Sequence, residues 1–305
     1  MRRKARARSQ KSARRAGPEG NQGPAMPIQS SRSLDEDPAH VEGEAGPVRV
    51  LSRGLAILRI FCPRNDWLSN HQIASAAHLP RPTVSRLVAS LAQAGYLEYS
   101  RDRGQNSLGA AVLALGYAAL SSIDLFELAR PLMQEFAGRE DLLVVLSTRD
   151  AMSMVCNEVC HGANMLTLRV GVGSRLSLCD SAVGRALIGA LPAPQRESLI
   201  SEIRSQEPSR WPALGPAFAD AVEQMQRNQF YTSIGTLEQG VNGMGAVIDV
   251  PGVPNTYVLG VAAPAFRLEP QFMQTELGPR LHALKRAIEL RLATSRTPEA
   301  RDATT

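Results

Sequence analysis

The stretch that most constrains the fold is residues 70–99, which reads as two short helices, a tight turn and the start of a strand. In residues 82–94 the apolar side chains recur at intervals of three and four, the spacing of one buried helix face. The buried stripe would hold Val84, Leu87, Val88 and Leu91, and the outward face Thr83, Ser85, Arg86, Ser90 and Gln93. A helix that packs by one side and presents short polar groups and an arginine on the other has the surface needed to read a major groove.

The residues on either side complete this pattern. A first helix is expected over residues 49–62, ended by Pro63 because the residue before a proline avoids helical backbone. Ser69 suits the N-cap of a helix over 70–77, and Gly95 the position just after the third helix. Residues 96–99 and 105–108 would then pair across the polar turn 100–104. Three helices followed by a hairpin indicate a winged helix-turn-helix over residues 47–108.

Length and composition limit the protein class. A chain of 305 residues with 44% apolar residues is long enough for two domains with real cores. It has no apolar run long enough to span a membrane and no secretory signal, so no membrane partner is expected. Four scattered cysteines do not suggest a disulfide framework. A cytoplasmic protein is therefore expected.

The positive charge is unevenly distributed. Residues 1–25 contain eight Lys or Arg and one Glu, whereas residues 47–108 contain eight Arg and three acids. The excess over 47–108 lies on the segment suspected of meeting DNA, and it is all arginine. An arginine can hold a phosphate or a guanine edge with two hydrogen bonds, which lysine cannot.

Both ends of the chain are expected to be disordered. Residues 1–46 are rich in Arg, Ser, Gly, Pro and Glu and cannot bury enough surface to offset chain entropy. They are interpreted as a plain tail, with Met26 as a second possible start, or as a basic arm that adds nonspecific phosphate contacts. Residues 297–305 form a second short tail.

Residues 109–122 are expected to link the two domains. Residues 110–121 are apolar nearly all round, which is typical of a helix covered on several sides. Because this helix has no second layer of its own domain to pack on, a partner subunit is its natural cover. We therefore expect a linker and dimerisation helix, and a homodimer or a dimer of dimers.

Residues 123–296 are expected to form one domain in which helices flank an antiparallel sheet. The segments 244–250 and 257–263 are joined by PGVPN, a clear hairpin signal. Helices are expected over 125–137, 181–191, 215–228 and 270–295, and further strands over 142–146, 152–159 and 165–170. This mixture indicates an α+β, GAF-like fold.

At this point the chain resembles the IclR family of bacterial transcriptional regulators. RVLSRGLAILRIF and IASAAHLPRPTVSRLVASLAQAGYLEY resemble its DNA-binding segments, and GQNSLGAAVLALG its second wing strand and linker. LRVGVGSRLSLCDSAVGRALIGALP, FYTSIGTLEQGVNGMGAV and VLGVAAPAFRLEP resemble its effector domain. The resemblance covers residues 48–296 and implies a repressor or activator. Its partners would be a double-stranded DNA operator of pseudo-palindromic sequence and a small-molecule effector.

Two sets of candidate residues follow. The DNA-binding set lies on the third helix and the wing: Arg81, Thr83, Ser85, Arg86, Ser90, Arg101 and Arg103. The effector-binding set is implied by position in the family: Met165, Leu168, Leu176, Ala182, Val183, Ser233, Val241, Gly243, Gly260 and Ala262. For Leu168, Leu176 and Val241, plain core packing is an equally good interpretation. The small residues in this set favour an effector larger or more apolar than a two- or three-carbon acid, such as an aromatic acid. Amides at the start of helix 181–191 are candidate donors for its carboxylate.

Some residues of the chain also suit other functions. Cys156, Cys160 and His161 could hold zinc or form a redox switch, but no fourth ligand stands at finger-like spacing. Since Cys156 and Cys160 are four apart on an expected strand, they should share a face. Because no enzyme motif is present, we expect no catalytic residues, no metal and no cofactor. The rival functions are a small-molecule or redox-sensing GAF-like protein without specific DNA binding, and a winged helix used only for docking.

Overall fold

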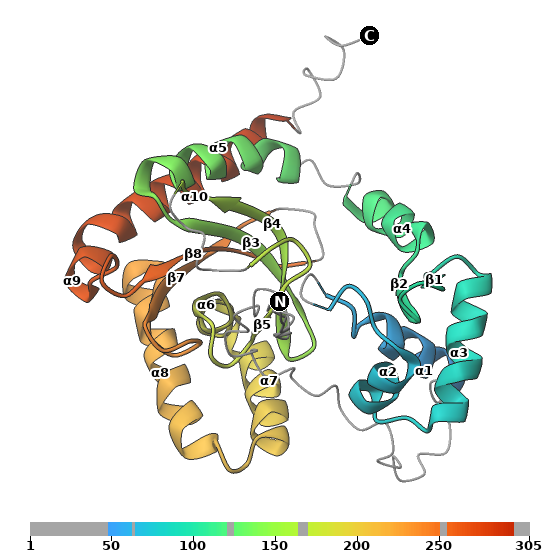
Figure 1. Cartoon of the computed structure of the whole chain (residues 1–305). Coiled ribbons are helices and arrows are strands. Elements are labelled where there is room, and N and C mark those ends of the chain that lie inside the picture. Colours follow the sequence, from blue (N-terminus) through green and yellow to red (C-terminus); the bar gives the residue numbers. More distant parts are fainter. Residues whose placement is uncertain (1–47, 63–64, 121–124, 164–169, 251–254, 296–305) are drawn as a thin grey trace, which may run out of the picture.

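The computed structural model describes residues 48–62, 65–120, 125–163, 170–250 and 255–295. The two tails expected to be disordered lie outside these residues. Figure 1 shows a smaller N-terminal unit beside a larger sheet-and-helix domain. No helix within the described ranges combines the length and the apolar character needed to cross a membrane.

The N-terminal unit is the predicted winged helix-turn-helix. Its helices are α1 (Arg49–Leu58), α2 (Asn70–Ala77) and α3 (Arg81–Gln93). Ser69 caps α2 as expected, and Gln72 completes a capping box by accepting from the Ser69 backbone amide at 2.9 Å. His78 ends α2 in the left-handed region, which turns the chain into α3. The core beneath the three helices includes Ile57, Ile73, Val84 and Val88, all buried.

The first helix is four residues shorter than predicted. It ends at Leu58, and the Ile60 amide donates to the Ile57 carbonyl at 3.2 Å, which tightens the chain into a turn. Cys62 then forms an isolated antiparallel bridge with Asn65. Such a bridge needs extended backbone, so the helix has to stop before Cys62.

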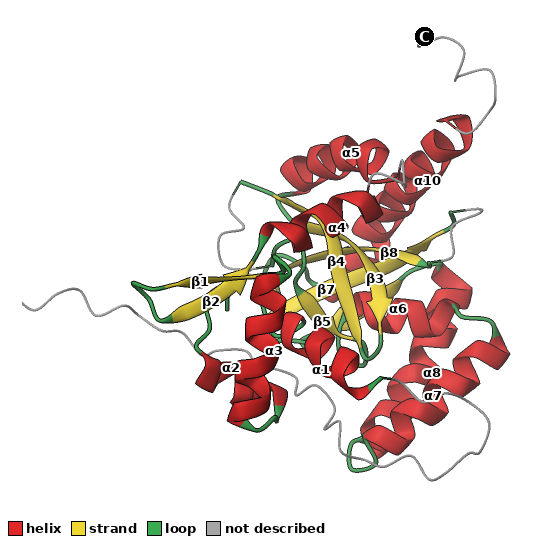
Figure 2. Ribbon diagram, turned by 90° about the vertical axis from the view of Figure 1, so that its right-hand side faces the viewer, coloured by secondary structure: helices red, strands yellow, loops and turns green. Residues whose placement is uncertain are grey.

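The wing consists of β1 (Leu97–Ser100) and β2 (Gln105–Leu108), paired antiparallel from Leu97 with Leu108 to Ser100 with Gln105. Figure 2 shows this hairpin extending from the helices. Gly95 and Gly104 have positive φ angles of 78° and 63°, which glycine tolerates at the end of α3 and in the wing turn.

Helix α4 (Ala110–Leu120) follows the wing, as predicted. Its side chains at Leu113, Leu115 and Tyr117 are 63%, 58% and 66% exposed. In a single chain, this helix therefore exposes an apolar surface whose contact with water is unfavourable.

The C-terminal domain is built on a six-stranded sheet of strand order β5-β4-β3-β8-β7-β6, in which every neighbouring pair is antiparallel. The α+β prediction is therefore confirmed. The strands are β3 (Leu143–Asp150), β4 (Ser153–His161), β5 (Arg175–Ser177), β6 (Tyr231–Ile234), β7 (Val241–Ile248) and β8 (Tyr257–Pro264). The helices are α5 (Leu125–Glu140), α6 (Ala182–Ala190), α7 (Ala193–Gln206), α8 (Trp211–Asn228), α9 (Pro270–Phe272), the π-helical turn η1 (Met273–Leu277) and α10 (Gly278–Ser295).

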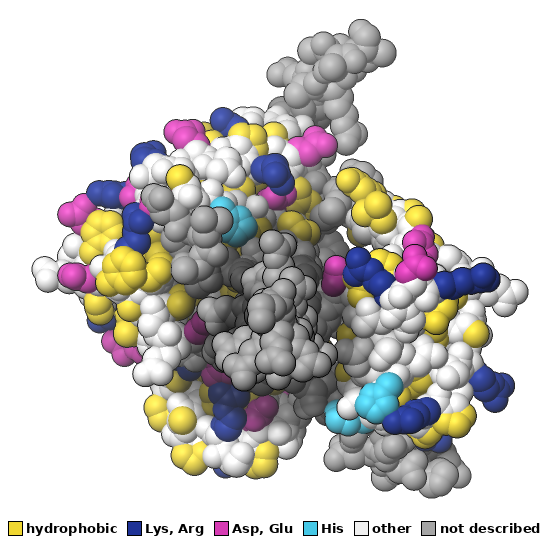
Figure 3. All heavy atoms as spheres, in the orientation of Figure 1, with side chains coloured by type: hydrophobic (Ala, Val, Ile, Leu, Met, Phe, Trp, Pro, Cys, Tyr) yellow, Lys and Arg dark blue, Asp and Glu magenta, His cyan; other side chains and the backbone are white. Residues whose placement is uncertain are grey.

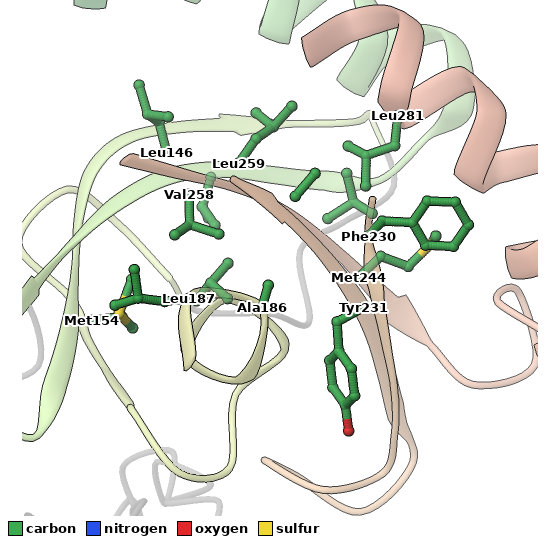
Figure 4. Close-up of a cluster of buried hydrophobic side chains, with 14 of the residues drawn as sticks. Leu146, Met154, Ala186, Leu187, Phe230, Tyr231, Met244, Val258, Leu259 and Leu281 are labelled. Carbon is green, nitrogen blue, oxygen red and sulfur yellow. The ribbon is translucent and has the colours of Figure 1, made fainter. Parts of the chain in front are cut away.

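Helices cover both faces of this sheet. Figure 1 places α5 and α10 over one face and α6 against the other, with α8 outside α6. In the close-up of Figure 4, Leu146 and Leu259 lie on the α5 and α10 side, whereas Met154 lies beside Leu187 of α6. Burial on both faces explains why β3 has five consecutive buried residues rather than a strict alternation.

Several predicted boundaries changed. Of the expected strand 165–170, residues 165–169 lie outside the described part, and Val170 belongs to no strand. Helix α8 begins at Trp211 instead of residue 215, and η1 interrupts the expected helix 270–295. Strands β5 and β6 and helix α7 were not predicted. Both strands are very short, and α7 has no clear apolar stripe.

Candidate DNA-binding face and effector site

Helix α3 presents the predicted polar face. Val84 and Val88 are buried in the winged-helix core, whereas Arg81, Ser85 and Arg86 are exposed. Thr83 is half-buried at the first turn of the helix. The apolar spacing read from the sequence therefore gives the face that the structure buries.

The two arginines of this face are exposed to solvent. Within the described residues, Arg81 and Arg86 make no ion pair and no side-chain hydrogen bond. The Ser90 hydroxyl donates to the Arg86 carbonyl at 3.1 Å, so it is engaged with its own helix. Pro80, the N-cap of α3, has no side chain that can accept from the first-turn amides, unlike Ser69 on α2.

The wing carries two further arginines on its turn. Arg101 and Arg103 are both exposed, and the Gly104 amide closes the turn by donating to the Ser100 carbonyl at 2.9 Å. Figure 3 shows basic side chains projecting from the winged-helix unit. The winged-helix unit thus places all seven predicted DNA-binding residues on one small, preformed scaffold.

Part of the predicted effector set forms one row across three strands. Ser233 of β6 pairs with Gly243 of β7, which in turn pairs with Ala262 of β8. Paired residues in a sheet point to the same face. A Cβ added to Gly243 would lie 3.5 Å from the Cβ of Ala182, the first residue of α6. The structure therefore brings Ala182, Ser233, Gly243 and Ala262 together where α6 begins.

The remaining residues of the set lie less close to this row. Val241 precedes Gly243 by two residues on the same face of β7, and Leu176 is buried on β5 at the far edge of the sheet. Gly260 leaves no open room, because a Cβ there would lie 2.3 Å from Val183 Cγ1. Its role in the structure is close packing of α6 on β8. Met165 and Leu168 lie outside the described residues.

A polar network beside the row was missed from the sequence. The Ser233 hydroxyl is hydrogen-bonded to Thr236, whose own hydroxyl donates to the Asp180 carbonyl at 2.6 Å. Arg210 binds the Asp180 carboxylate at 2.5 Å. Burial lowers the pKa of Arg210, but the hydrogen bond and the charge of Asp180 raise it by more, so the net shift is upward. The network ties the β6–β7 turn and the start of α8 to the residues that lead into α6.

A buried arginine completes the surroundings of this row. Arg185 is 8% exposed; its Nε donates to the Cys179 carbonyl at 2.7 Å, and a terminal nitrogen donates to the Tyr231 hydroxyl at 3.0 Å. Tyr231 and Ser233 alternate on β6 and share a face, which is the sequence signal that could have revealed the tyrosine. Arg185 holds the turn 178–181 in place from inside the domain.

The first turn of α6 leaves two backbone amides without an acceptor among the described residues. Ser181 caps the helix by accepting from the Gly184 amide at 3.1 Å. No described residue accepts from the amides of Ala182 and Val183. Helix N-termini with such amides attract negatively charged groups.

The expectation that Cys156 and Cys160 share a face is wrong. A bulge shifts the register between Leu146 and Ser147, so that Cys156 pairs with Ser147 and Cys160 with Val144. Because the extra residue reverses the alternation, Cys156 faces α6 and Cys160 faces α5, where its thiol lies 3.9 Å from the Arg130 carbonyl oxygen. Burial raises the pKa of Cys156 to about 12 and is the main reason that the pKa of Cys160 rises to about 11. Side chains on opposite faces cannot form one disulfide.

One ion-pair cluster connects the two units. Asp150, at the end of β3, accepts from Arg175 of β5 at 2.7 Å with one carboxylate oxygen. Its other oxygen lies 3.3 Å from a guanidinium nitrogen of Arg59, just after α1. No group of three or more His, Cys, Asp or Glu suited to a metal ion occurs in the described part of the chain.

Two family models match this chain. The IclR helix-turn-helix domain matches residues 50–101, and the C-terminal domain of the bacterial transcriptional regulator IclR matches residues 117–289. The HTH-type transcriptional regulator TsaQ1/TsaQ2 of Comamonas testosteroni is 31% identical over 261 residues, which is 85% of this chain and 93% of that protein.

Solved structures agree with these matches. An IclR family transcriptional regulator from Brucella abortus is 34% identical and superposes with a TM-score of 0.69, covering 80% of this chain and 92% of that one. An IclR homolog from Microbacterium hydrocarbonoxydans, complexed with 4-hydroxybenzoate, is 21% identical and has a TM-score of 0.62, covering 81% and 100% of the two chains. The second likeness is one of fold.

Proposed function

Because the chain belongs to the IclR family of bacterial transcriptional regulators, we propose that it is a sequence-specific DNA-binding regulator, repressor or activator, whose operator binding responds to a small molecule. The observation that carries the DNA-binding part is the pair Arg81 and Arg86. These arginines stand on the exposed face of α3 without any partner among the described residues. A helix that packs by its apolar side and offers unpaired arginines is suited to base edges and phosphates in the major groove.

Each predicted residue has a role in this proposal. Ser85 and Arg86 contact base edges, with Arg81 and Thr83 near the first turn of α3 and Ser90 farther along it. Arg101 and Arg103 contact backbone phosphates from the wing. The uncapped first turn of α3 supports the same arrangement, because its amides can donate to a phosphate.

The second part of the proposal is a homodimer or a dimer of dimers acting in the cytoplasm. The exposed apolar residues of α4 support it, and Val50, Leu51 and Leu55 add an exposed apolar stretch on α1. Covering these side chains with a second copy removes them from water. Two winged helices in one dimer would occupy successive major grooves about one helical turn apart on a pseudo-palindromic operator.

We propose an organic acid as the effector, and the small side chains of the row favour an aromatic acid. The row of Ser233, Gly243 and Ala262 offers small side chains, and the amides of Ala182 and Val183 offer donors for a carboxylate. The same fold in the Microbacterium hydrocarbonoxydans protein is complexed with 4-hydroxybenzoate, so this architecture can house an aromatic acid. The bound acid would shift the population of dimers whose winged helices match the operator spacing.

Selection of bound sequences from random duplex DNA, repeated at two salt concentrations, tests the DNA-binding part. We expect a palindrome-like motif that persists at the higher salt concentration. Binding without a motif that vanishes with salt would instead favour a small-molecule sensor that does not read sequence, because phosphate contacts alone are strongly salt-dependent.

Thermal unfolding with added acids tests the effector part. Benzoate should raise the melting temperature of the effector domain more than glyoxylate does at equal concentration, because a ligand that binds the folded state stabilises it. A Gly243→Val variant should lose this difference while the protein still binds its operator. Equal shifts by both acids would overturn the assignment of an aromatic effector.

A further inference from the structure

The two wing arginines differ in their surroundings. The guanidinium carbon of Arg103 lies 4.8 Å from the centre of the Trp67 ring, within the range of a cation–π contact. Arg101, on the same turn, has no ring contact among the described residues. Trp67 lies between α1 and α2 and was not among the residues singled out from the sequence.

A buried asparagine fixes Trp67 beside the wing. The next residue, Leu68, exchanges two backbone hydrogen bonds with Asn106 of β2, at 2.9 and 2.8 Å. Asn106 is 1% exposed, and its side-chain amide donates to the Leu68 carbonyl at 3.2 Å and to the Asn70 side chain at 2.9 Å. The segment before α2 therefore acts as a short third strand of the wing, and it carries the indole with it.

The backbone that carries Arg103 is also fixed. Its amide donates to the Ser100 hydroxyl at 3.4 Å, and Gly104 closes the same turn with a left-handed φ of 63°. Trp67 thus precedes a residue that is paired with β2, and Arg103 lies in a closed turn. The backbone of each partner is fixed, so the arginine has little freedom left except along its side chain.

Stacking leaves the arginine able to bind an anion. The guanidinium carbon lies over the indole ring, and the N–H donors of a guanidinium lie in its own plane, so donors directed away from the ring stay available. Arg103 remains exposed to solvent beside the ring. A guanidinium held in this way loses less side-chain entropy when it binds the two oxygens of a phosphate.

We infer that Trp67 is a positioning residue for DNA binding: it holds Arg103 over the wing for one phosphate of the duplex backbone. Arg103 then makes a stronger wing contact than Arg101. This inference rests on the proposed function, since it assigns the phosphate contact of a winged helix that is itself proposed to bind an operator.

A double-mutant cycle on the selected operator duplex tests this inference. Operator affinity would be measured across a series of salt concentrations for Trp67→Leu, Arg103→Ala, the pair together, and Arg101→Ala as a matched control. For each winged helix on the duplex, Arg103→Ala should lower the slope of log affinity against log salt by about one, and Trp67→Leu should weaken binding about two- to fivefold. A dimer with two winged helices on the operator should show each effect twice. In the Arg103→Ala background, Trp67→Leu should have no further effect.

Two conservative variants keep the result independent of folding. Trp67→Phe should retain most of the affinity because it keeps a ring face. Arg103→Lys should retain the salt slope but depend less on Trp67, since an ammonium is still attracted by the ring but has no planar face to stack. The inference about Trp67 would be overturned if the losses of affinity from Trp67→Leu and Arg103→Ala simply add. It would also be overturned if Arg101→Ala loses more affinity than Arg103→Ala. Either result would leave the proposed function, binding to an operator, unaffected. A wild-type protein that selects no motif would overturn the proposed function as well.

Discussion

The two units of this chain differ in how their arginines are neutralised. In the effector domain, Arg130 lies 2.6 Å from Glu158 and Arg280 lies 2.8 Å from Glu140. In the winged helix, Arg81, Arg86 and Arg101 make no ion pair with any described residue. Paired cations serve the fold, whereas unpaired cations on one face create a positive potential that a polyanion can relieve. The unpaired arginines of the winged helix therefore support the proposed DNA-binding surface.

Among the described glycines, close backbone approaches are more numerous in the effector domain than in the winged helix. In the effector domain, a Cβ added to Gly184 of α6 would lie 2.1 Å from the Leu178 carbonyl oxygen, and one added to Gly245 would lie 2.7 Å from the Ala182 carbonyl oxygen. The winged helix has one such approach where β2 ends, because a Cβ added to Gly109 would lie 2.3 Å from the Gly95 carbonyl oxygen. Its small core is otherwise built from side-chain contacts around Ile57 and Ile73. Tight packing suits a domain that must transmit a ligand's presence, while the winged helix needs only a stable platform.

Replacing Gly184 with alanine should have the largest effect on stability. Alanine normally stabilises a helix relative to glycine by up to ~1 kcal/mol. Here the new methyl would overlap backbone, so we expect the free energy of unfolding of the effector domain to fall by about 3 kcal/mol. Chemical denaturation measures this change. Gly138→Ala in α5, where nothing lies within 4 Å of the new methyl, is the matched control and should be stabilising. A stabilised Gly184→Ala protein would contradict the close packing of α6.

Replacing Arg86 with alanine should weaken operator binding by about 1–3 kcal/mol if it makes a bidentate base contact, and should relax the sequence preference at that position. Binding to the selected operator and to single-base variants measures both effects. Arg227→Ala is the matched control, because Arg227 is an exposed helix arginine of the effector domain that pairs with Glu223 at 3.5 Å. Equal operator affinity for the wild type and Arg86→Ala would remove Arg86 from the DNA-binding set.

The sequence predicted the winged helix well because its signals are local. The apolar spacing of α3, the Ser69 cap and the positive φ of Gly95 depend on residues close together in the chain, and all three are confirmed. The effector domain was harder because its decisive contacts are distant in sequence. No residue near Arg185 in the sequence indicates that its side chain would donate to the Tyr231 hydroxyl. The bulge that places Cys156 and Cys160 on opposite faces also has no local sequence signature.

The predicted effector site also depends on contacts between residues that are distant in the sequence. The pairing of Ser233, Gly243 and Ala262 depends on strand register, which the sequence suggested only through a family resemblance. The role of Gly260 depended on a side chain of α6, and sequence reasoning could not tell an open space from one filled by Val183. Whether these residues bind the effector stays a prediction.

Removing the N-cap of α2 should destabilise the winged helix. Ser69→Ala should lower the stability of the winged helix by about 1 kcal/mol, because it leaves first-turn amides of α2 without an acceptor. Thermal unfolding monitored on the winged helix measures this loss. Ser205→Ala in α7 is the control, since that exposed hydroxyl only donates to the Glu202 carbonyl at 2.8 Å. A loss of equal size in both variants would show that the cap is not the cause.

The smallest effect concerns the thiols. Cys156, Cys160 and Cys179 are buried in the effector domain, with pKa values raised to about 12, 11 and 11 chiefly by burial, whereas Cys62 in the winged helix is half-buried. In the folded protein, a thiol reagent should label Cys62 first and the other three only on unfolding.

The same pKa values predict the direction of a pH effect. An unfolded thiol loses its proton above about pH 9, the ordinary value, while the folded Cys156 still holds it. Its contribution to stability is therefore complete below about pH 9 and is lost as the pH rises toward 12. Denaturation curves recorded below and above pH 9 measure this change in the free energy of unfolding. The Cys156→Ala variant should show a smaller change. Stability that increases with alkaline pH would contradict the raised pKa.

Asp150 accepts from Arg175 of the effector-domain sheet and from Arg59 just after the first helix of the winged helix, and all three side chains are at least partly exposed. Dissolved ions screen such exposed pairs. The ion pairs of Asp150 that connect the effector domain with the winged helix are therefore expected to weaken when a cell accumulates salt under osmotic stress. In such a cell the orientation of the winged helix would become less restricted even while the effector concentration stays constant.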